Sequence, residues 1–418
     1  MSTIRSKDVM DIIFRTLGVV DKEVMMHSEI TGYLLYKILE FNGHYTKREL
    51  LDYILIGLLH DIGLFKESSR EDLGNAEIID PIKHSLYGYL FIRFFTPLGD
   101  DKAAIVRDHH QHYNRFPALK MSTQNKKVLE YLNLIDKLEH RRMGFLRPNY
   151  FKVNKDITFS GKAFQEFQAL ENQEHVLEKL KDGSYKKELN QFLEEHSLSE
   201  RDMRKFLEMM IYIIDFRSEV TVIHTMSTVY FAECLGVLLG LSRDEIRDIH
   251  YGAMLHDLGK VDIPLEILES SGGLSNEEME IMKSHVQKTE EILTGSIDDT
   301  IVRIATRHHE KLDGSGYPKG LKACDLTLSE QLVAVADILS ALYSKRSYKE
   351  AFEKETIQNI LQSDADAGKI NKEIVACLMN NYDSIIENYE KEKEDIIGRY
   401  LKIKETYEDL YQILKAYG

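Results

Sequence analysis

The sequence is poor in residues that interrupt helices or cross-link the chain. It has no tryptophan and only 6 prolines and 3 cysteines among 418 residues. Scarce proline favours helices, because a proline inside a helix removes a backbone hydrogen bond. The cysteines, Cys234, Cys324 and Cys377, lie too far apart for a cysteine zinc cluster or a redox pair. We therefore expect buried thiols in a reducing compartment.

Long apolar runs and an excess of positive charge are also missing. No stretch approaches the roughly 20 apolar residues that cross a bilayer, and the first residues, MSTIRSKDVM, lack the apolar core of a signal peptide. The formal net charge of −15, without a long basic run, would repel a phosphate polymer. We expect a cytoplasmic protein that has neither a membrane nor a nucleic acid polymer as partner; a small phosphate ligand stays possible.

What the sequence does contain is helical periodicity. Apolar residues recur every three or four positions almost throughout, while strand-like alternation is rare. Capping boxes that mark helix starts occur at Thr46 with Glu49, Ser242 with Glu245, and Ser275 with Glu278. We predict an all-α fold, and the chain length predicts two or three domains.

Histidines and aspartates reveal an internal repeat. The N-terminal half carries His27, His60-Asp61, His84, His109-His110 and Asp136. The C-terminal half repeats this order with His224, His256-Asp257, His285, His308-His309 and Asp337. Ten of the 16 histidines belong to these two sets, which scattered surface histidines would not do. A duplication is the simplest explanation.

The repeat and the charge pattern divide the chain into four predicted segments. These are an N-terminal domain at 1–145, a charged helical connector at 146–205, a C-terminal domain at 206–385 and an amphipathic helix at 386–418. The last helix has apolar residues at heptad spacing: Ile396, Tyr400, Ile403, Tyr407, Leu410, Leu414 and Tyr417. We expect this seam to pack on the chain's own domain, with a homodimer through the helix as the alternative.

Each set offers five imidazoles and two carboxylates without any thiolate. Such a nitrogen and oxygen set suits iron, manganese, nickel or zinc. Seven ligands exceed what one ion needs, so we predict a binuclear centre in which one carboxylate bridges two ions. Two such ions acidify a shared water and neutralise charge in phosphoester hydrolysis.

The C-terminal half, from about Phe216 to Lys349, resembles the HD-GYP phosphodiesterases. The resemblance is carried by HDLGK at 256–260, HHEKLDGSGYP at 308–318 and the aspartate of VADILSAL at 337. It implies that His224, His256, Asp257 and Asp337 hold one ion. It also implies that Asp257, His285, His308 and His309 hold the other, with Asp257 as the bridge.

The resemblance further implies a substrate, cyclic di-GMP, which is opened to pGpG and by some members cleaved further to GMP. Lys260 matches a phosphate-contacting lysine, and Arg346 and Lys349 match basic positions that hold the other phosphate and a guanine. A solvated helix face is the alternative interpretation of these three. The loop residues Asp313, Gly314, Gly316, Tyr317 and Pro318 form a turn by their own chemistry. They either shape the rim of the site or contact substrate or a partner domain.

Three positions depart from the HD-GYP pattern. Val220 stands where some members carry a glutamate for a third metal, so a two-metal site is expected here. Ser340 replaces a frequent aspartate, which suggests a missing ligand or substrate contact. Thr289 replaces a common glycine.

The N-terminal half resembles the broader HD phosphohydrolase superfamily and keeps every ligand of the two-metal pattern. Glu23, four residues before His27, is a further candidate ligand. Leu64 replaces the lysine, HHQHYNRFP has no glycine, and Glu139 occupies the position of Ser340. This half could be a second enzyme site, a metal or oxygen sensor, or a metal-bound structural domain.

From these observations we predict an enzyme with tandem HD-type helical domains. It hydrolyses a cyclic dinucleotide, with cyclic di-GMP favoured, at the C-terminal site through Asp257 and Lys260 and two divalent ions, iron or manganese. Hydrolysis of 3',3'-cyclic GMP-AMP and a non-hydrolytic metal or nucleotide sensor are the alternatives.

Overall fold

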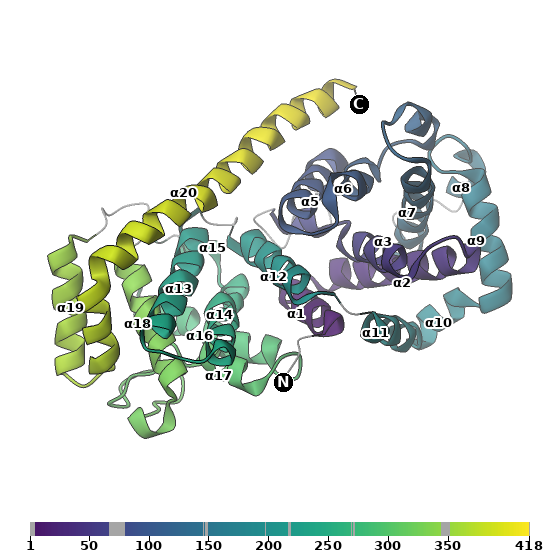
Figure 1. Ribbon diagram of the computed structural model, residues 1–418. Helices are drawn as coiled ribbons and strands as arrows, with labels where there is room; N and C mark the ends of the chain where they lie inside the picture. The colour runs from purple at the N-terminus through teal and green to yellow at the C-terminus, as the bar shows by residue number, and fades with distance from the viewer. Residues whose placement is uncertain are drawn as a thin grey trace. The chain divides into compact units, whose positions relative to one another are not determined.

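The structure is a computed structural model in which every regular element is a helix, as Figure 1 shows. It describes residues 5–66, 80–144, 146, 149–196, 198–215, 219–268, 270, 272–343 and 352–417. Over these residues the only β-type pairings are three isolated bridges, such as Asp313 with Lys322. The predicted all-α fold is confirmed.

The chain forms two compact units, each with one copy of the repeat. The N-terminal unit comprises Arg5–Met10, Val20–Met209 and Ile403–Gly418. The C-terminal unit contains Asp11–Val19 and Met210–Lys402. Three helices contribute residues to both units: α1 (Ser6–Val20), α12 (Glu200–Asp215) and α20 (Lys372–Tyr417).

The ligand-bearing helices of the N-terminal unit follow one another in the chain. They are α2 (Lys22–Asn42), α3 (Lys47–Leu59), the 3-10 turn η1 (Ile62–Lys66), α5 (Pro81–Phe95), α6 (Gly99–Asp108), η2 (Tyr113–Ala118) and α7 (Thr123–Arg142). The predicted capping box at Thr46 is present at the start of α3. Helix α3 ends at Leu59, immediately before His60.

The predicted connector packs as part of the N-terminal unit. Its helices are α8 (Tyr150–Val153), α9 (Gly161–Glu174), α10 (Val176–Asp182) and α11 (Tyr185–Glu195). Glu188 of α11 accepts a hydrogen bond from the Tyr33 hydroxyl of α2, and Glu166 of α9 accepts one from Tyr131 of α7. These helices thereby brace the two helices that carry His27 and Asp136.

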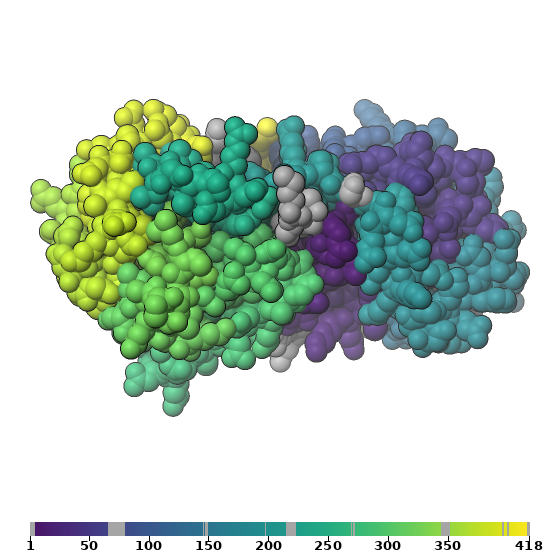
Figure 2. Space-filling view, turned by 60° about the horizontal axis from the view of Figure 1, so that its bottom comes forward, coloured from purple at the N-terminus to yellow at the C-terminus, as the bar shows by residue number. Residues whose placement is uncertain are grey.

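The C-terminal unit repeats the same succession. It contains α13 (Glu219–Leu238), α14 (Arg243–Leu255), η3 (Leu258–Asp262), α15 (Leu265–Leu268), α16 (Asn276–Leu293), α17 (Asp299–Thr306), η4 (Ala323–Asp325), α18 (Leu328–Tyr343) and α19 (Lys354–Asp366). The capping boxes at Ser242 and Ser275 open α14 and α16 as predicted. In Figure 2, the yellow atoms of α20 lie against the teal and green atoms of this unit.

Helix α20 begins at Lys372, earlier than the predicted start near residue 386. Its first turns bury Ile374, Val375 and Leu378, so the last helix of the domain and the charged terminal helix are one continuous element. Further along, Ile403 and Tyr407 are buried in the N-terminal unit. The Tyr407 ring stacks on Tyr87 of α5 at a centroid distance of 4.0 Å. The seam was expected to pack on its own domain, but these two residues pack in the N-terminal unit of the same chain. The homodimer stays a prediction.

The thiols are less buried than predicted. Cys324 is exposed in the turn η4, while Cys234 and Cys377 are half-buried on helices. No helix among the described residues combines the length and the apolar character needed to cross a bilayer.

Candidate metal centres

The predicted C-terminal ligands converge from five parts of the unit. His224 lies within α13, His285 within α16 and Asp337 within α18. His256 ends α14 and Asp257 follows it, while His308 and His309 come just after α17. The repeat therefore places each imidazole or carboxylate on a helix or at the end of one, where the backbone fixes its direction.

Asp257 lies at the centre of this cluster. Its Oδ2 is 3.1 Å from Nε2 of His256 and 3.7 Å from Nε2 of His224. Its other oxygen, Oδ1, is 3.4 Å from Nε2 of His285. Each oxygen thus faces a different group of imidazoles, which is the arrangement that a bridging carboxylate requires.

Asp337 and the histidine pair complete the two groups. Asp337 Oδ1 lies 3.1 Å from Nε2 of His224 and 3.6 Å from Nε2 of His256. On the other side, Nε2 of His285 and Nε2 of His308 are 3.5 Å apart. The ligand atoms lie within 4.8 Å of one another in each of two clusters. One cluster is His224, His256 and Asp257, and the other is His285, His308 and His309.

Backbone carbonyls orient the imidazoles. In the C-terminal unit, Nδ1 of His256, His285 and His308 each lies 2.6 to 2.7 Å from the carbonyl oxygen three residues earlier. A hydrogen bond from Nδ1–H fixes the tautomer and directs Nε2 at the metal position. His60 and His109 of the N-terminal unit make the same contact.

Ser340 has a positioning contact that the sequence interpretation missed. Its Oγ lies 2.7 Å from Nδ1 of His224 and donates to the His224 carbonyl at 3.0 Å. The side chain is fully buried and also contacts the Ser227 hydroxyl. The serine at position 340 therefore does more than remove an acidic group, because its hydroxyl orients the candidate ligand His224.

A glycine lets the His-Asp turn approach the next ligand helix in both units. A Cβ on Gly259 would lie 1.9 Å from the backbone oxygen of His285, and one on Gly63 would lie 2.0 Å from that of His84. The buried Thr289 hydroxyl accepts from the Gly259 N–H at 2.9 Å and reaches the His256 carbonyl at 3.2 Å. The departure at Thr289 thus adds hydrogen bonds that hold the turn.

The charges of the site are strongly coupled. Burial alone would raise the pKa of Asp257, but His256 and Lys260 hold it well below its usual range. Burial lowers the pKa of His308 well below its ordinary value and that of His309 to about 3. These imidazoles are therefore neutral, the form that binds metal. Burial also disfavours charge on His256, but Asp257 raises its pKa to about 10, so an ion that binds there displaces a proton.

The predicted substrate residues are partly brought to the site. Lys260 Nζ lies 2.5 Å from Asp257 Oδ2. The Tyr317 ring lies 4.7 Å from that of His309, and the Tyr317 N–H donates to the His309 carbonyl at 3.2 Å. Arg346 and Lys349 lie outside the described residues.

The rest of the loop is held by buried Glu310. Its carboxylate accepts from the backbone N–H groups of Lys319 and Leu321, each at 2.8 Å. Gly316 packs so closely that a Cβ there would lie 2.3 Å from the Lys311 nitrogen. The Asp313 carboxylate accepts hydrogen bonds from the Ser315 N–H and hydroxyl within the loop. Gly314 has a positive φ of 84°, a conformation that favours glycine.

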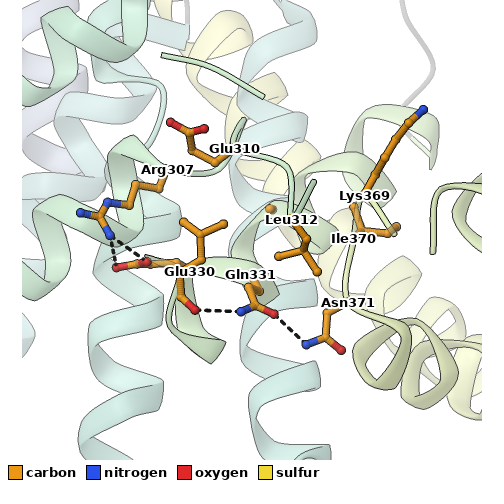
Figure 3. A pocket seen from close by; sticks show the side chains of 10 residues that line it. Arg307, Glu310, Leu312, Glu330, Gln331, Lys369, Ile370 and Asn371 are labelled. Carbon is orange, nitrogen blue, oxygen red and sulfur yellow. Dashed lines mark hydrogen bonds and ion pairs between the residues drawn. The ribbon is translucent and has the colours of Figure 1, made fainter. Parts of the chain in front are cut away.

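A small pocket is lined by residues that include Glu310 and Leu312, just before the loop, as Figure 3 shows. Arg307 pairs with the buried Glu330 at 3.1 Å, and Gln331 accepts a hydrogen bond from Asn371 at 2.7 Å. These polar groups of the lining bond one another. No candidate metal ligand lines the pocket.

The N-terminal ligands converge in the same way. Asp61 Oδ2 lies 3.2 Å from Nε2 of His60 and 3.4 Å from Nε2 of His27. Its Oδ1 lies 3.5 Å from Nε2 of His84 and 3.6 Å from Nε2 of His109. His110 Nε2 is 2.9 Å from that of His84, and Asp136 Oδ1 is 3.5 Å from Nε2 of His27. Seven predicted residues are thus together.

Other N-terminal expectations turn out differently. Glu23 is exposed and belongs to none of the ligand clusters among the described residues. Glu139 is buried but pairs with Arg142 at 2.8 Å. His140, which the sequence interpretation missed, joins a cluster with His27 and Asp136. Its signal was its place one helical turn after Asp136, where residues share a face.

Both donor sets fit bound metal ions. Both oxygens of Asp61 and of Asp136 are buried without a hydrogen-bond partner, as are Asp257 Oδ1, His256 Nε2 and His109 Nε2. A buried carboxylate without partners is costly, and coordination to a cation removes this cost. Imidazole and carboxylate donors suit a divalent transition ion.

Comparison with known proteins agrees with this geometry. The family model of the HD domain matches residues 208–374. The chain is 23% identical over 391 residues to 3'3'-cGAMP-specific phosphodiesterase 1 of Vibrio cholerae, covering 88% of this chain and 90% of that protein. It is 40% identical over 160 residues to the cyclic di-GMP phosphodiesterase response regulator RpfG of Xanthomonas campestris, covering 38% of this chain and 42% of the relative.

Two further proteins are similar. A cyclic di-GMP phosphodiesterase of Thermotoga maritima is 34% identical over 193 residues, covering 45% of this chain and 52% of the relative. The crystal structure of the Vibrio cholerae cyclic GMP-AMP phosphodiesterase V-cGAP3 superposes with a TM-score of 0.53 at 17% identity. That match covers 92% of this chain and 98% of the other and shows a shared fold. Residues 208–374 of this chain therefore match the HD domain model, and its C-terminal half is similar in sequence to cyclic-dinucleotide phosphodiesterases, in agreement with its HDLGK and GYP motifs.

Proposed function

We propose that this protein is a metal-dependent phosphodiesterase that hydrolyses cyclic di-GMP to pGpG at its C-terminal site, with GMP as a further product. One observation carries the proposal. Six candidate ligands cluster around Asp257, the seventh, and Lys260 pairs with the Asp257 carboxylate at 2.5 Å. A cation beside a metal centre suits a phosphodiester, which bears a negative charge on each linkage.

In this reaction, water adds to phosphorus, one P–O3' bond breaks, and the ribose hydroxyl leaves with a proton. Bound divalent ions would supply Lewis acidity and an activated water. His224, His256, Asp257 and Asp337 would hold one ion, while Asp257, His285, His308 and His309 would hold the other. Lys260 would bind a non-bridging phosphate oxygen and offset the charge that builds up there. The Tyr317 ring beside His309 would limit where a base can lie.

A second substrate is supported by one comparison. A relative that is matched over 88% of this chain is named for 3'3'-cGAMP. We therefore keep 3',3'-cyclic GMP-AMP as the alternative substrate. A non-hydrolytic sensor of metal or nucleotide is the alternative class.

We also propose the domain and metal assignments. Residues 1–145 would form an HD-type domain and residues 206–385 the HD-GYP domain. Each would hold two divalent ions, iron or manganese. The N-terminal domain keeps its ligands but has Leu64 in place of Lys260, which favours a regulatory or structural role.

Turnover of both dinucleotides tests the proposal. Wild type, Asp257→Ala and Asp61→Ala form a matched set, because these residues have equivalent places in the two units. Each would be assayed under anaerobic Fe²⁺ and under Mn²⁺. We expect loss of turnover only in Asp257→Ala; loss only in Asp61→Ala would move catalysis to the N-terminal site. Binding without turnover in every form would favour the sensor.

The variant Lys260→Met tests the contribution of the Lys260 charge to catalysis separately from that of the metal ions. We expect it to lower kcat about 100-fold while the metal content stays unchanged. Lys391→Met is the control, because Lys391 is exposed on α20 and pairs with Glu387 rather than with Asp257.

A further inference from the structure

His140 distinguishes the N-terminal metal centre from the C-terminal one. It lies on α7, four residues after Asp136. The equivalent position on α18, four residues after Asp337, is Ala341, which has no donor atom. The internal repeat therefore gives one copy an imidazole that the other copy lacks.

The geometry places this imidazole in the coordination sphere of one ion. Nε2 of His140 lies 3.6 Å from Asp136 Oδ1, and Nε2 of His27 lies 3.5 Å from the same oxygen. The two rings stack with an interplanar angle of 13° and a centroid distance of 5.5 Å. Ligand atoms around one ion with bonds of about 2.1 Å are separated by about 3 to 3.5 Å. Small side-chain adjustments bring all three atoms onto a common ion.

Burial supports the same assignment. The Asp136 side chain is 1% exposed and neither of its oxygens has a hydrogen-bond partner. The His140 side chain is 16% exposed. These groups face one another in the protein interior, where a shared cation offsets the cost of the buried carboxylate.

We propose that His140 is a protein ligand of the ion that His27, His60, Asp61 and Asp136 hold. That ion then has five protein ligands, whereas the matching C-terminal ion has four. A catalytic ion needs an open position for water or substrate, while a closed coordination sphere is typical of a structural site. The extra imidazole thus makes the N-terminal ion the more firmly retained one. This inference rests on the proposed metal sites, and not on hydrolysis of a dinucleotide.

Metal release from the full-length chain tests it. The background variant Asp257→Asn weakens the C-terminal centre, so that the retained Mn²⁺ reports on the N-terminal one. The protein is loaded with Mn²⁺, freed of excess ion and mixed with a chelator, and the released metal is followed over time. We expect His140→Ala to speed release of the retained ion at least about tenfold.

Two further variants make the result specific. His140→Gln keeps a polar side chain of similar length but is a weak metal ligand, and we expect it to speed release as well. It also decides the question if His140→Ala does not fold, which circular dichroism of the metal-free protein reports. His44→Ala, at an exposed histidine outside every cluster among the described residues, is the control and should release metal as the background does.

The proposal is overturned if the folded His140 variants release Mn²⁺ as slowly as the control. It is also overturned if the Asp257→Asn protein retains no ion. Neither result depends on turnover, so a failure here is distinct from a failure of the proposed hydrolysis.

Discussion

The Ser340 hydroxyl lies 2.7 Å from Nδ1 of His224, on the side of the ring opposite the candidate metal. Outer-shell partners of this kind typically contribute ten- to a hundredfold in metal affinity. We therefore expect Ser340→Ala to weaken Mn²⁺ binding at the C-terminal site by about tenfold, measured by competition with a chelator.

Ser284→Ala is the matched control for that change. Ser284 lies on α16 next to the ligand His285, but its side chain is exposed and its hydroxyl donates to the Ile281 carbonyl rather than to an imidazole. Equal affinities for the two variants would show that Ser340 does not orient His224.

Gly259→Ala should destabilise the C-terminal unit. The new methyl group would lie 1.9 Å from the His285 carbonyl oxygen, so either the turn or α16 must move. Overpacking of this kind costs about 1 to 3 kcal/mol, and we expect a lower midpoint of denaturant unfolding. Gly273→Ala, where a Cβ meets no atom within 4 Å, should leave the midpoint unchanged. Two unchanged midpoints would contradict the packing.

Tyr407→Ala should loosen the end of α20. The ring is 6% exposed and stacks on Tyr87, and loss of a buried aromatic side chain costs about 3 to 5 kcal/mol. We expect faster hydrogen exchange over residues 403–417. Leu401→Ala, at a side chain that is 48% exposed, should change exchange little. If Tyr407→Ala instead alters only the sedimentation of the protein, the seam serves a dimer.

Removal of metal should lower thermal stability. Ions that bind only the folded chain stabilise it by about 4 kcal/mol when their concentration is 1,000 times the dissociation constant. We expect a chelator to lower the Tm in calorimetry and added Mn²⁺ to restore it. In the double variant Asp61→Ala/Asp257→Ala the chelator should have no effect. A wild-type Tm that does not respond would argue against filled sites.

Much of this architecture was predictable because ligand spacing and helix starts are local properties. The capping boxes at Thr46, Ser242 and Ser275 give helices that begin where predicted. The two ordered ligand sets converge because each residue lies at an equivalent place in a repeated succession of helices. The GYP loop is a turn because its glycines and proline disfavour a helix.

Other features depend on which side chains meet in three dimensions. From the sequence, Ser340 was interpreted as the loss of an aspartate. Its hydrogen bond with His224 could not be predicted, because it joins two helices that are far apart in the chain. His140 has no counterpart in the second copy, so a search for repeated residues passes over it. Glu23 has the right spacing, yet its side chain faces solvent. The start of α20 was predicted too late, because its apolar first turns resemble any other core helix.

The carbonyl contacts of His60, His109, His256, His285 and His308 have a consequence for how such centres diversify. Each ring takes its direction from its own helical turn, so the information for the donor set is contained in short, separable stretches of backbone. Neighbouring loops can then be exchanged without loss of the donors, and the two halves illustrate this with one glycine-rich loop and one without glycine. In protein engineering, the metal-binding residues could therefore be kept constant while the surrounding loops are varied to change which small molecule the site binds.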